Sequence, residues 1–392
     1  MFLIKTYFVP SSAYEIKKKV EKIGKQISII KGKITGVVDI SGNPDHPLFE
    51  AETTVSNVNE NIFHKIEEKK ENISIASIDS SSRYLRDPSV NMVFVGLGVY
   101  SNIKGIKVGP FDIDINFMAI GTFEDLLKEF NPESGVRVKN YVNKYFTEDY
   151  RIDDIADELR LEAENAGLKE NRDTHDLVIV DGPLFPTPLE LSELELQSEG
   201  RKRHQEAYLQ LTKDRIAILR NNVVGVVKRL ETSQKLYKVD KVKQLLGIRY
   251  PINDAEILNQ IRIKTGFKQG LLGPFKIEFN SKYFDAPTRY AYYLVLTNPI
   301  GMSSYCRIES LSLNSLEELT PHIVNRISER LIPTYIEIAD NLSKRVSASL
   351  FITAYQILSR IISVVHDDKL TYYNEVRSLS ESLLQHQRTL LT

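Results

Sequence analysis

The segment that most restricts how this chain can fold is the short apolar run Asp-Leu-Val-Ile-Val at residues 176–180. Its length and its β-branched residues predict a strand that is buried inside a sheet. Asp181, Gly182 and Pro183 follow it directly and predict a sharp turn at the end of the strand. A buried strand that ends in such a turn is typical of the central sheet of an α/β protein.

The residues around this strand predict further strands and helices. Alternating apolar residues at 73–80, 92–100 and 113–122 predict three strands, whose connections suit an antiparallel meander. Apolar residues at helical spacing then predict a helix over residues 152–166, which Gly167 would end. We therefore expect one α/β core with helices added at both ends. The same patterns predict strands around residues 34–40 and at 223–228, 275–279, 290–296 and 305–311, and helices at 190–220, 316–330 and 334–365.

Composition and charge exclude several classes of protein. The chain has 392 residues and no run of 18 consecutive apolar residues, so no transmembrane helix is expected. Its first residues lack the basic-then-apolar order of a signal peptide, and we expect a cytoplasmic protein without membrane contact. The single cysteine, Cys306, cannot form an internal disulfide or a thiolate metal cluster. The formal net charge is −1, so any contact with nucleic acid must come from local basic patches.

The N-terminal region carries a basic patch beside an apolar stripe. Apolar residues from Ala13 to Ile30 recur at alternating spacings of three and four residues, which predicts one apolar face on a helix. Residues 1–35 contain eight lysines and two glutamates. The helix is either a solvated surface helix or a basic arm that touches nucleic acid or a partner. We treat residues 1–72 as an N-terminal helical arm with its connection, and residues 73–392 as the main domain with C-terminal helices.

Several well-known catalytic motifs are absent from the sequence. There is no G-x-x-x-x-G-K-[ST] phosphate-binding loop, no G-x-S-x-G nucleophile turn and no H-E-x-x-H zinc motif. Gly96-Leu97-Gly98 matches the start of a dinucleotide-binding loop, but Ser101 stands at the third glycine position and the segment predicts a strand. The seven histidines are scattered without the spacing of metal ligands. These absences exclude a P-loop ATPase and argue against histidine-based zinc chemistry.

Carboxylates are the stronger candidates for chemistry. Asp79 and Asp181 each follow an apolar run that predicts a buried strand. Burying an ionised carboxylate is costly, so an acid at the end of an apolar strand needs a partner. Either residue alone could be a turn-forming or helix-capping aspartate. Two such acids with an acid-bearing helix between them are typical of a divalent-cation site with oxygen ligands, which favours Mg²⁺ or Mn²⁺.

The helix predicted at residues 152–166 offers several glutamates for the same site. Glu158 and Glu162 are four residues apart and share a face, whereas Glu164 is expected to point away from that face. Glu162 adjoins the apolar stripe at Leu159, which would shelter it partly from water. Glu162 is therefore our choice for the third ligand, and Glu158 and Glu164 remain alternatives.

Segments from about residue 73 to 365 resemble, in order, the motifs of the NurA nuclease family. D-G-x-L alone occurs widely, and the signal lies in the succession of the segments along the chain. The segments are IASIDSSSR at 75–83, LRLEAENA at 159–166, DLVIVDGPL at 176–184, VVGVVKRLETSQKL at 223–236, YCRIES at 305–310 with Arg307 and Glu309, and IPTYIEIAD at 332–340.

The resemblance implies a ribonuclease H-like (Piwi-like) mixed sheet flanked by helices and a metal-dependent DNA nuclease. NurA proteins form homodimers, degrade DNA with Mn²⁺ and work with the hexameric ATPase HerA in processing DNA ends for recombinational repair. Asp79 and Asp181 would then be ligands shared by two metal ions, with Glu162 and Asp340 completing the shell. Lys228 would hold a phosphate oxygen or stabilise developing charge, although on the bare sequence it could equally be a solvated lysine at a strand end.

Two departures from the family pattern leave a second function open. Asp79 is followed by Ser-Ser rather than Gly-Ser, and Asp340 stands where the family has a histidine. An aspartate can bind a hard cation, but it cannot transfer protons near neutral pH as a histidine does. The alternative is a catalytically weakened relative that serves as a DNA-binding or ATPase-docking subunit.

Two kinds of contact are expected at the surface. The stripe from Ala13 to Ile30, or the last helices, would contribute to a homodimer interface because an apolar face must be covered. Lys17–Lys19 and Arg201–Arg203 are the candidate phosphate contacts for DNA, since each is a local cluster of basic residues.

Overall fold

A computed structural model describes residues 12–31, 53–67, 69, 72–87, 90–187, 191 and 198–362. The helices are α1 (Ala13–Lys31), α2 (Glu124–Lys128), α3 (Ile152–Asn171), α4 (Glu199–Ile218), α5 (Asp240–Leu246), α6 (Asp254–Thr265), α7 (Leu313–Val324) and α8 (Thr334–Ile362). The strands are β1 (Thr53–Asn57), β2 (Phe63–His64), β3 (Ile75–Asp87), β4 (Val90–Ser101), β5 (Gly105–Gly109), β6 (Met118–Gly121), β7 (Val136–Arg137), β8 (Leu177–Asp181), β9 (Val223–Val227), β10 (Gly270–Phe279), β11 (Arg289–Thr297) and β12 (Ser303–Ser310).

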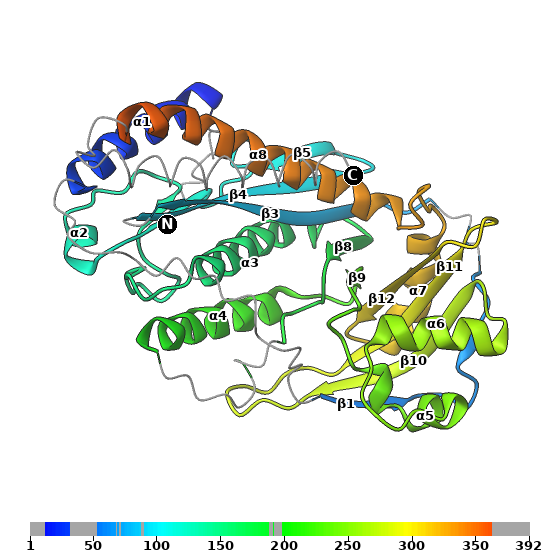
Figure 1. Cartoon of the computed structure of the whole chain (residues 1–392). Helices are drawn as coiled ribbons and strands as arrows, with labels where there is room; N and C mark the ends of the chain where they lie inside the picture. Colours follow the sequence, from blue (N-terminus) through cyan, green and yellow to red (C-terminus); the bar gives the residue numbers. More distant parts are fainter. Residues whose placement is uncertain are drawn as a thin grey trace, which may run out of the picture.

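All of these strands belong to one mixed sheet (Figure 1). Its order is β1-β10-β11-β12-β9-β8-β3-β4-β6-β7, with β2 paired to β10 and β5 paired to β4. β3, β4 and β6 are antiparallel neighbours, as the meander pattern predicts. β8 is parallel to β3, and β9 is parallel to β8. The expected α/β fold, a mixed sheet flanked by helices with further helices near both ends, is confirmed.

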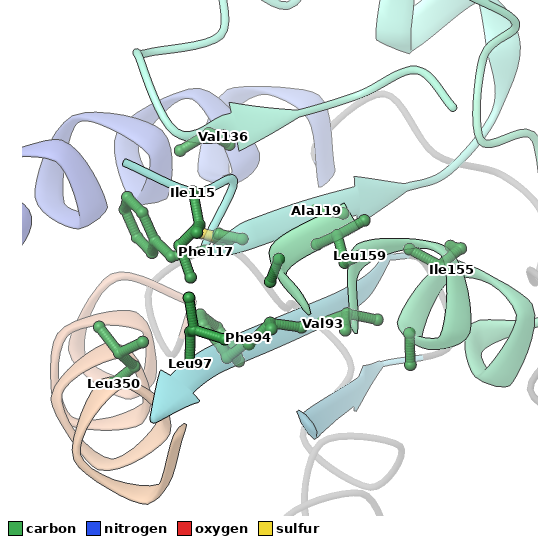
Figure 2. Packing of buried hydrophobic residues seen from close by; sticks show 14 of the residues in the cluster. Val93, Phe94, Leu97, Ile115, Phe117, Ala119, Val136, Ile155, Leu159 and Leu350 are labelled. Atoms are coloured by element: carbon green, nitrogen blue, oxygen red, sulfur yellow. The ribbon is translucent and has the colours of Figure 1, made fainter. Parts of the chain in front are cut away.

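Helices cover both faces of the central strands. In Figure 1, α8 and α1 lie on one side of β3 and β4, and α3 and α4 lie on the other. Figure 2 shows Val93 of β4 beside Ile155 and Leu159 of α3. The next residue, Phe94, points the opposite way and makes an edge-to-face ring contact with Phe351 of α8, with ring centroids 6.2 Å apart. β4 is therefore apolar on both faces, which explains the continuous apolar run that predicted it.

Two glycines of β4 allow α8 to lie directly on the sheet. A Cβ atom at Gly96 would lie 2.5 Å from the backbone nitrogen of Ser347, and one at Gly98 would lie 2.6 Å from the carbonyl oxygen of Ala339. No side chain fits at these distances, so the backbone of α8 approaches β4 only because both residues are glycine. The Gly-x-Gly pair therefore places α8, and with it Asp340, against the sheet.

Two of the central elements run further than the sequence patterns predict. β3 does not end near Asp79 but continues to Asp87, because its antiparallel pairing with β4 extends over the whole of that length. α3 does not stop at Gly167 but continues to Asn171. A Cβ atom at Gly167 would lie 3.1 Å from the Ile78 side chain, so this glycine serves close helix-to-strand packing rather than helix termination.

Several other predicted elements are present in the structure, although their ends are shifted. The strands expected at 223–228, 275–279, 290–296 and 305–311 correspond to β9, β10, β11 and β12, and α7 ends at Val324 rather than near residue 330. The strand expected around residues 34–40 lies outside the described residues. β1 and β2 both pair with β10, so the sheet includes strands that precede the expected domain boundary at residue 72.

The apolar stripe of the N-terminal helix is covered by the chain itself. α1 packs on α8, and the stripe residues that face it belong to the main core and are at most 3% exposed. These residues are Ile16, Val20, Ile23, Ile27 and Ile30. The expectation that this stripe forms a dimer contact is therefore wrong, because its apolar surface is already buried within one chain. The homodimer itself stays a prediction.

Candidate metal centre

The centre of the candidate site is the carboxylate of Asp79 on β3. β8 pairs with β3 only from Ile75 to Ile78, so Asp79 is the first residue of β3 beyond its parallel neighbour. The residue is 4% exposed, and its Oδ2 accepts a hydrogen bond of 2.5 Å from Ser343 Oγ of α8. Asp79 is therefore buried between the sheet and α8 at the point where β8 ends.

Two other aspartates converge on the same point. Asp181 is the last residue of β8, and Asp340 lies in the second turn of α8. One carboxylate oxygen from each of Asp79, Asp181 and Asp340 lies within 4.8 Å of the other two. Among the described residues, no other group of three histidine, cysteine or acidic side chains meets this condition. The structure thus brings together three of the four acids that the sequence proposes as ligands.

Burial and mutual repulsion oppose ionisation of Asp79 and Asp181. Burial, followed by the negative charge of Asp181, raises the pKa of Asp79 from 3.8 to about 8. Burial likewise raises the pKa of Asp181 to about 6, although the ammonium of Lys228 opposes this shift. Carboxylates that are difficult to ionise together are stabilised by a cation between them, which is the electrostatic condition for binding a divalent metal ion.

Lysines compensate part of the negative charge. Lys228 follows β9, and its Nζ lies 2.5 Å from Asp181 Oδ2 and 3.7 Å from Asp340 Oδ1. Lys344 lies one helical turn after Asp340, and its Nζ is 2.7 Å from Asp340 Oδ2. The resemblance implies that Lys228 belongs to this site, and its side chain lies beside the aspartates, while its role stays a prediction. Lys344 was not among the predicted residues, although its position four residues after Asp340 is a spacing that could have indicated it.

The structure does not bring Glu162 to this cluster. Its Oε1 lies 2.5 Å from Arg137 Nη2 and 3.1 Å from Asn116 Nδ2, in a separate cavity on another face of α3. Glu164 instead faces the cluster, where its Oε1 accepts a 2.6 Å hydrogen bond from Ser80, the neighbour of Asp79. Its Oε2 pairs with Arg215 at 2.8 Å. Glu164 points away from the side of Glu162, as expected, but its side of α3 is the one that β3 and α4 enclose, so the choice of Glu162 for this cluster was wrong.

The third alternative, Glu158, belongs to a different buried network. Its carboxylate accepts from Tyr150 OH and lies 2.9 Å from His204 Nδ1. Arg201, expected as a phosphate contact, pairs with Asp154 in the same region and is 7% exposed. Arg201 is therefore unavailable to DNA, whereas Lys17 and Lys18 of the other predicted cluster are exposed.

The turn after β8 holds Asp181 in place. The backbone N–H of Gly182 donates to Val226 O of β9 at 2.9 Å. The backbone N–H of Leu184 donates to Glu309 Oε2 at 3.2 Å, and the fully buried Glu309 is paired with Arg289 and Arg307. Both arginines lower the pKa of Glu309 to about 2, against the effect of burial, so this acceptor stays ionised. The Arg307 and Glu309 positions that resemble the family motif thus support the site without lining it.

The donor set fits a hard divalent cation. All three converging groups are carboxylates, and oxygen-only ligand sets favour Mg²⁺ or Mn²⁺ over softer metals. They line a cavity of about 400 Å³ that is open to solvent, so a cation and part of a ligand can enter together. Arg83, Arg160 and Arg229 also line this cavity. Buried acids surrounded by basic side chains are suited to chemistry on a phosphate ester.

The strand order and the acidic cluster define the class of this protein. Three antiparallel strands, followed by a helix and two parallel strands, form a ribonuclease H-like sheet, with Asp79 inside its central strand β3 and Asp181 at the end of the adjacent strand β8. A family model described as the NurA domain matches residues 73–345, which is well over half of the chain. The chain belongs to the NurA family of nucleases.

Solved structures of NurA proteins show weak similarity to this chain. The NurA nuclease from Sulfolobus solfataricus is 15% identical, with 76% of this chain and 87% of that chain covered and a TM-score of 0.43. A structure of NurA bound to dAMP and manganese is 10% identical, with coverages of 71% and 85% and a TM-score of 0.39. Comparison with curated proteins gives no match. No helix in the described parts of the chain has the length and apolar character needed to span a membrane.

Proposed function

We propose that this protein is a metal-dependent deoxyribonuclease that hydrolyses phosphodiester bonds in single- or double-stranded DNA. The observation that carries this proposal is the convergence of Asp79, Asp181 and Asp340 in a cavity that basic side chains also line. The pKa values of Asp79 and Asp181 are raised by burial, so both carboxylates gain from a bound cation. The membership of the NurA family supports the same activity.

Each side chain has a proposed role in this reaction. Asp79, Asp181 and Asp340 would hold Mn²⁺, or Mg²⁺ in its place, and when bound, one or two such ions supply an activated water and stabilise the leaving oxygen. Lys228 would turn from the carboxylates to a non-bridging phosphate oxygen, because a bound divalent cation repels its ammonium. Ser343 fixes the orientation of Asp79 through its hydrogen bond.

We propose that Glu164, and not Glu162, is the glutamate of α3 that serves this site, although not as a metal ligand. Its carboxylate is buried beside Ser80 and adds to the negative charge that raises the pKa values of Asp79 and Asp181. Glu164 would influence Asp79 and Asp181 through its negative charge, and it would hold Ser80 in position through their hydrogen bond. Arg215 pairs with its second carboxylate oxygen. Glu162 would contribute to folding through its pairing with Arg137.

The partners and the cellular role follow from the family resemblance and are proposals for this chain. The protein would act in the cytoplasm on DNA ends during recombinational repair, as a homodimer and together with a hexameric ATPase of the HerA type. The dimer contact would lie outside the stripe of α1. Light scattering at micromolar concentration tests the dimer, since a mass near 44.8 kDa would correspond to one chain and contradict it.

The alternative is a DNA-binding or ATPase-docking subunit without cleavage activity. The observation in its favour is that the third converging group is Asp340, where the family resemblance expects a histidine, so the acidic cluster has no imidazole to transfer protons. Incubation of labelled single- and double-stranded DNA with Mn²⁺ and with EDTA distinguishes the two functions. Cleavage that requires Mn²⁺ and is lost in Asp181→Asn supports the nuclease. DNA binding without cleavage at any Mn²⁺ concentration would support the alternative.

A further inference from the structure

The turn that follows β8 folds back across β9 and reaches β12. β9 lies between β8 and β12 in the sheet (Figure 1). A Cβ atom at Gly225 of β9 would lie 2.6 Å from the backbone nitrogen of Leu184 and 2.8 Å from the carbonyl oxygen of Gly182. No side chain fits at these distances, so the turn crosses β9 only because residue 225 is glycine. The backbone of the turn thereby reaches the carboxylate of Glu309 on β12.

Two buried arginines hold Glu309 and this turn together. Arg289 Nη1 donates to Glu309 Oε2 at 3.1 Å, and the same oxygen accepts from the backbone N–H of Leu184. The Arg289 guanidinium also lies over the ring of Phe185, 4.5 Å from its centroid. Arg307 Nε donates to the other carboxylate oxygen, Glu309 Oε1, at 2.7 Å. Each of these residues is at most 4% exposed, so the position of the turn depends on these contacts and not on water.

Arg307 also holds the segment that follows β9 and begins with Lys228. Its Nη1 donates to Ser233 Oγ at 3.0 Å. Asp254, the first residue of α6, accepts from Ser233 Oγ at 2.5 Å, and the same oxygen lies 3.6 Å from Arg307 Nη1. The other carboxylate oxygen of Asp254 accepts from the backbone N–H of Leu236 at 2.7 Å. Arg307 thus fixes the chain five residues after Lys228.

We propose that Arg307 is a positioning residue of the metal centre, which sets the position of Asp181 relative to Lys228. Each of the two segments that Arg307 holds carries one of these side chains, whose charged atoms lie 2.5 Å apart. Arg307 does not line the cavity of the three aspartates, so it acts only through these segments. Its planar guanidinium donates to Glu309 and to Ser233 at the same time, which the compact ammonium of a lysine does not reproduce. This inference rests on the proposed metal-dependent function and extends it to a residue outside the cavity.

Isothermal titration calorimetry of Mn²⁺ with the full-length protein, without DNA, tests this role independently of cleavage. The test variant is Arg307→Lys, which keeps the buried positive charge. The matched control is Arg172→Lys, because Arg172 is 19% exposed and also joins two elements, through its hydrogen bond to the carbonyl oxygen of Ile218. Loss of a residue that orients a metal ligand typically weakens metal binding at least tenfold. We therefore expect Arg307→Lys to raise the Kd of Mn²⁺ about tenfold, and the control to change it less than about twofold.

Cleavage at saturating Mn²⁺ gives a second measurement on the same variants. The cleavage rate of Arg307→Lys should stay about tenfold below that of the wild type even when the metal site is full, because Lys228 is displaced as well as Asp181. The rate of Arg172→Lys should equal that of the wild type. Melting curves of both variants show whether each is folded at the temperature of the assays.

The outcomes separate this inference from the proposed function. If Arg307→Lys melts at a lower temperature but binds Mn²⁺ as tightly as the control, Arg307 is only structural and the inference is refuted, while the nuclease stands. If the wild type binds no Mn²⁺, the proposed function fails and the positioning role fails with it. If Arg307→Lys is unfolded in the assay, Ser233→Ala decides, because it removes one hydrogen bond and keeps every buried charge. A Kd for Mn²⁺ raised about threefold in Ser233→Ala supports the role, and a Kd equal to that of the wild type refutes it.

Discussion

Replacing Asp79 with asparagine should stabilise the metal-free protein at neutral pH. Burial raises the pKa of Asp79 from 3.8 to about 8, so at pH 7 the folded protein holds a proton that the unfolded chain has lost. One pKa unit corresponds to about 1.4 kcal/mol, and the difference of roughly three units between 3.8 and pH 7 corresponds to about 4 kcal/mol. Asparagine cannot ionise, and its side-chain oxygen can still accept the hydrogen bond from Ser343.

The sign of the pH dependence follows from the same shift. A carboxyl group with a raised pKa in the folded state makes the free energy of unfolding fall as pH rises from 3.8 to about 8. Asp181, with its pKa raised to about 6, adds to this fall up to that pH. Asp79→Asn removes the first contribution, so its advantage over the wild type should grow by about 2 to 3 kcal/mol between pH 5 and pH 7.

Urea unfolding in EDTA at pH 5, 6, 7 and 8 measures the difference in the free energy of unfolding between variant and wild type. It appears as a shift of the urea midpoint when the dependence of the free energy on urea concentration is the same for both. Asp125→Asn is the matched control, because the Asp125 side chain is 95% exposed and its removal should not depend on pH in this way. Addition of Mn²⁺ should narrow the difference between the variant and the wild type. At one hundred times its Kd the ion would stabilise the wild type by about 2.7 kcal/mol and leave Asp79→Asn nearly unchanged. A variant that is less stable than the wild type at pH 8 in EDTA would refute the reasoning.

Three further predictions concern single positions. Asp340→His should retain some cleavage but raise the Mn²⁺ concentration needed for the half-maximal cleavage rate. The cleavage rate of this variant should also change between about pH 6 and 7, where histidine titrates. If its metal titration and pH profile equal those of the wild type, Asp340 is only a surface acid. Glu164→Gln should reduce the cleavage rate at least tenfold, whereas Glu162→Gln should mainly lower the melting temperature, and the reverse result would restore Glu162 to the site. Gly98→Ala should destabilise the fold by roughly 1 to 3 kcal/mol in urea unfolding, because its methyl group would meet the backbone of α8; an unchanged midpoint would show that α8 can shift.

Much of the fold could be predicted because its signals are local. The apolar residues 177–180 are buried on both faces of the sheet, and that burial is what their composition indicates. Asp79 and Asp181 stand out for the same reason, since an acid next to an apolar strand is costly without a partner. The meander and the helix at 152–166 could be predicted because apolar residues recur about every two residues in a strand and about every 3.6 residues in a helix.

The ends of these elements depend on neighbours that the sequence does not reveal. β3 extends past Asp79 because β4 pairs with it as far as Asp87, so Asp79 lies within the strand rather than at its end. Gly167 sits inside α3 because Ile78 of a distant strand packs against it. A local pattern identifies a glycine, but only the packing decides whether it ends a helix or permits close contact.

The tertiary structure alone decided which acids meet. Glu162 and Glu164 are two residues apart on one helix, and helical periodicity places them on different faces without indicating which face meets the site. Arg137, from the strand β7, draws Glu162 to one side, while Ser80 and Arg215 enclose Glu164 on the other. Asp340 reaches the cluster because two glycines let α8 lie on the sheet. The sequence by itself indicated the strands and the aspartates on β3 and β8, because an acid beside a buried apolar run is visible within a few residues. The other residues of the site come together only through packing between distant parts of the chain.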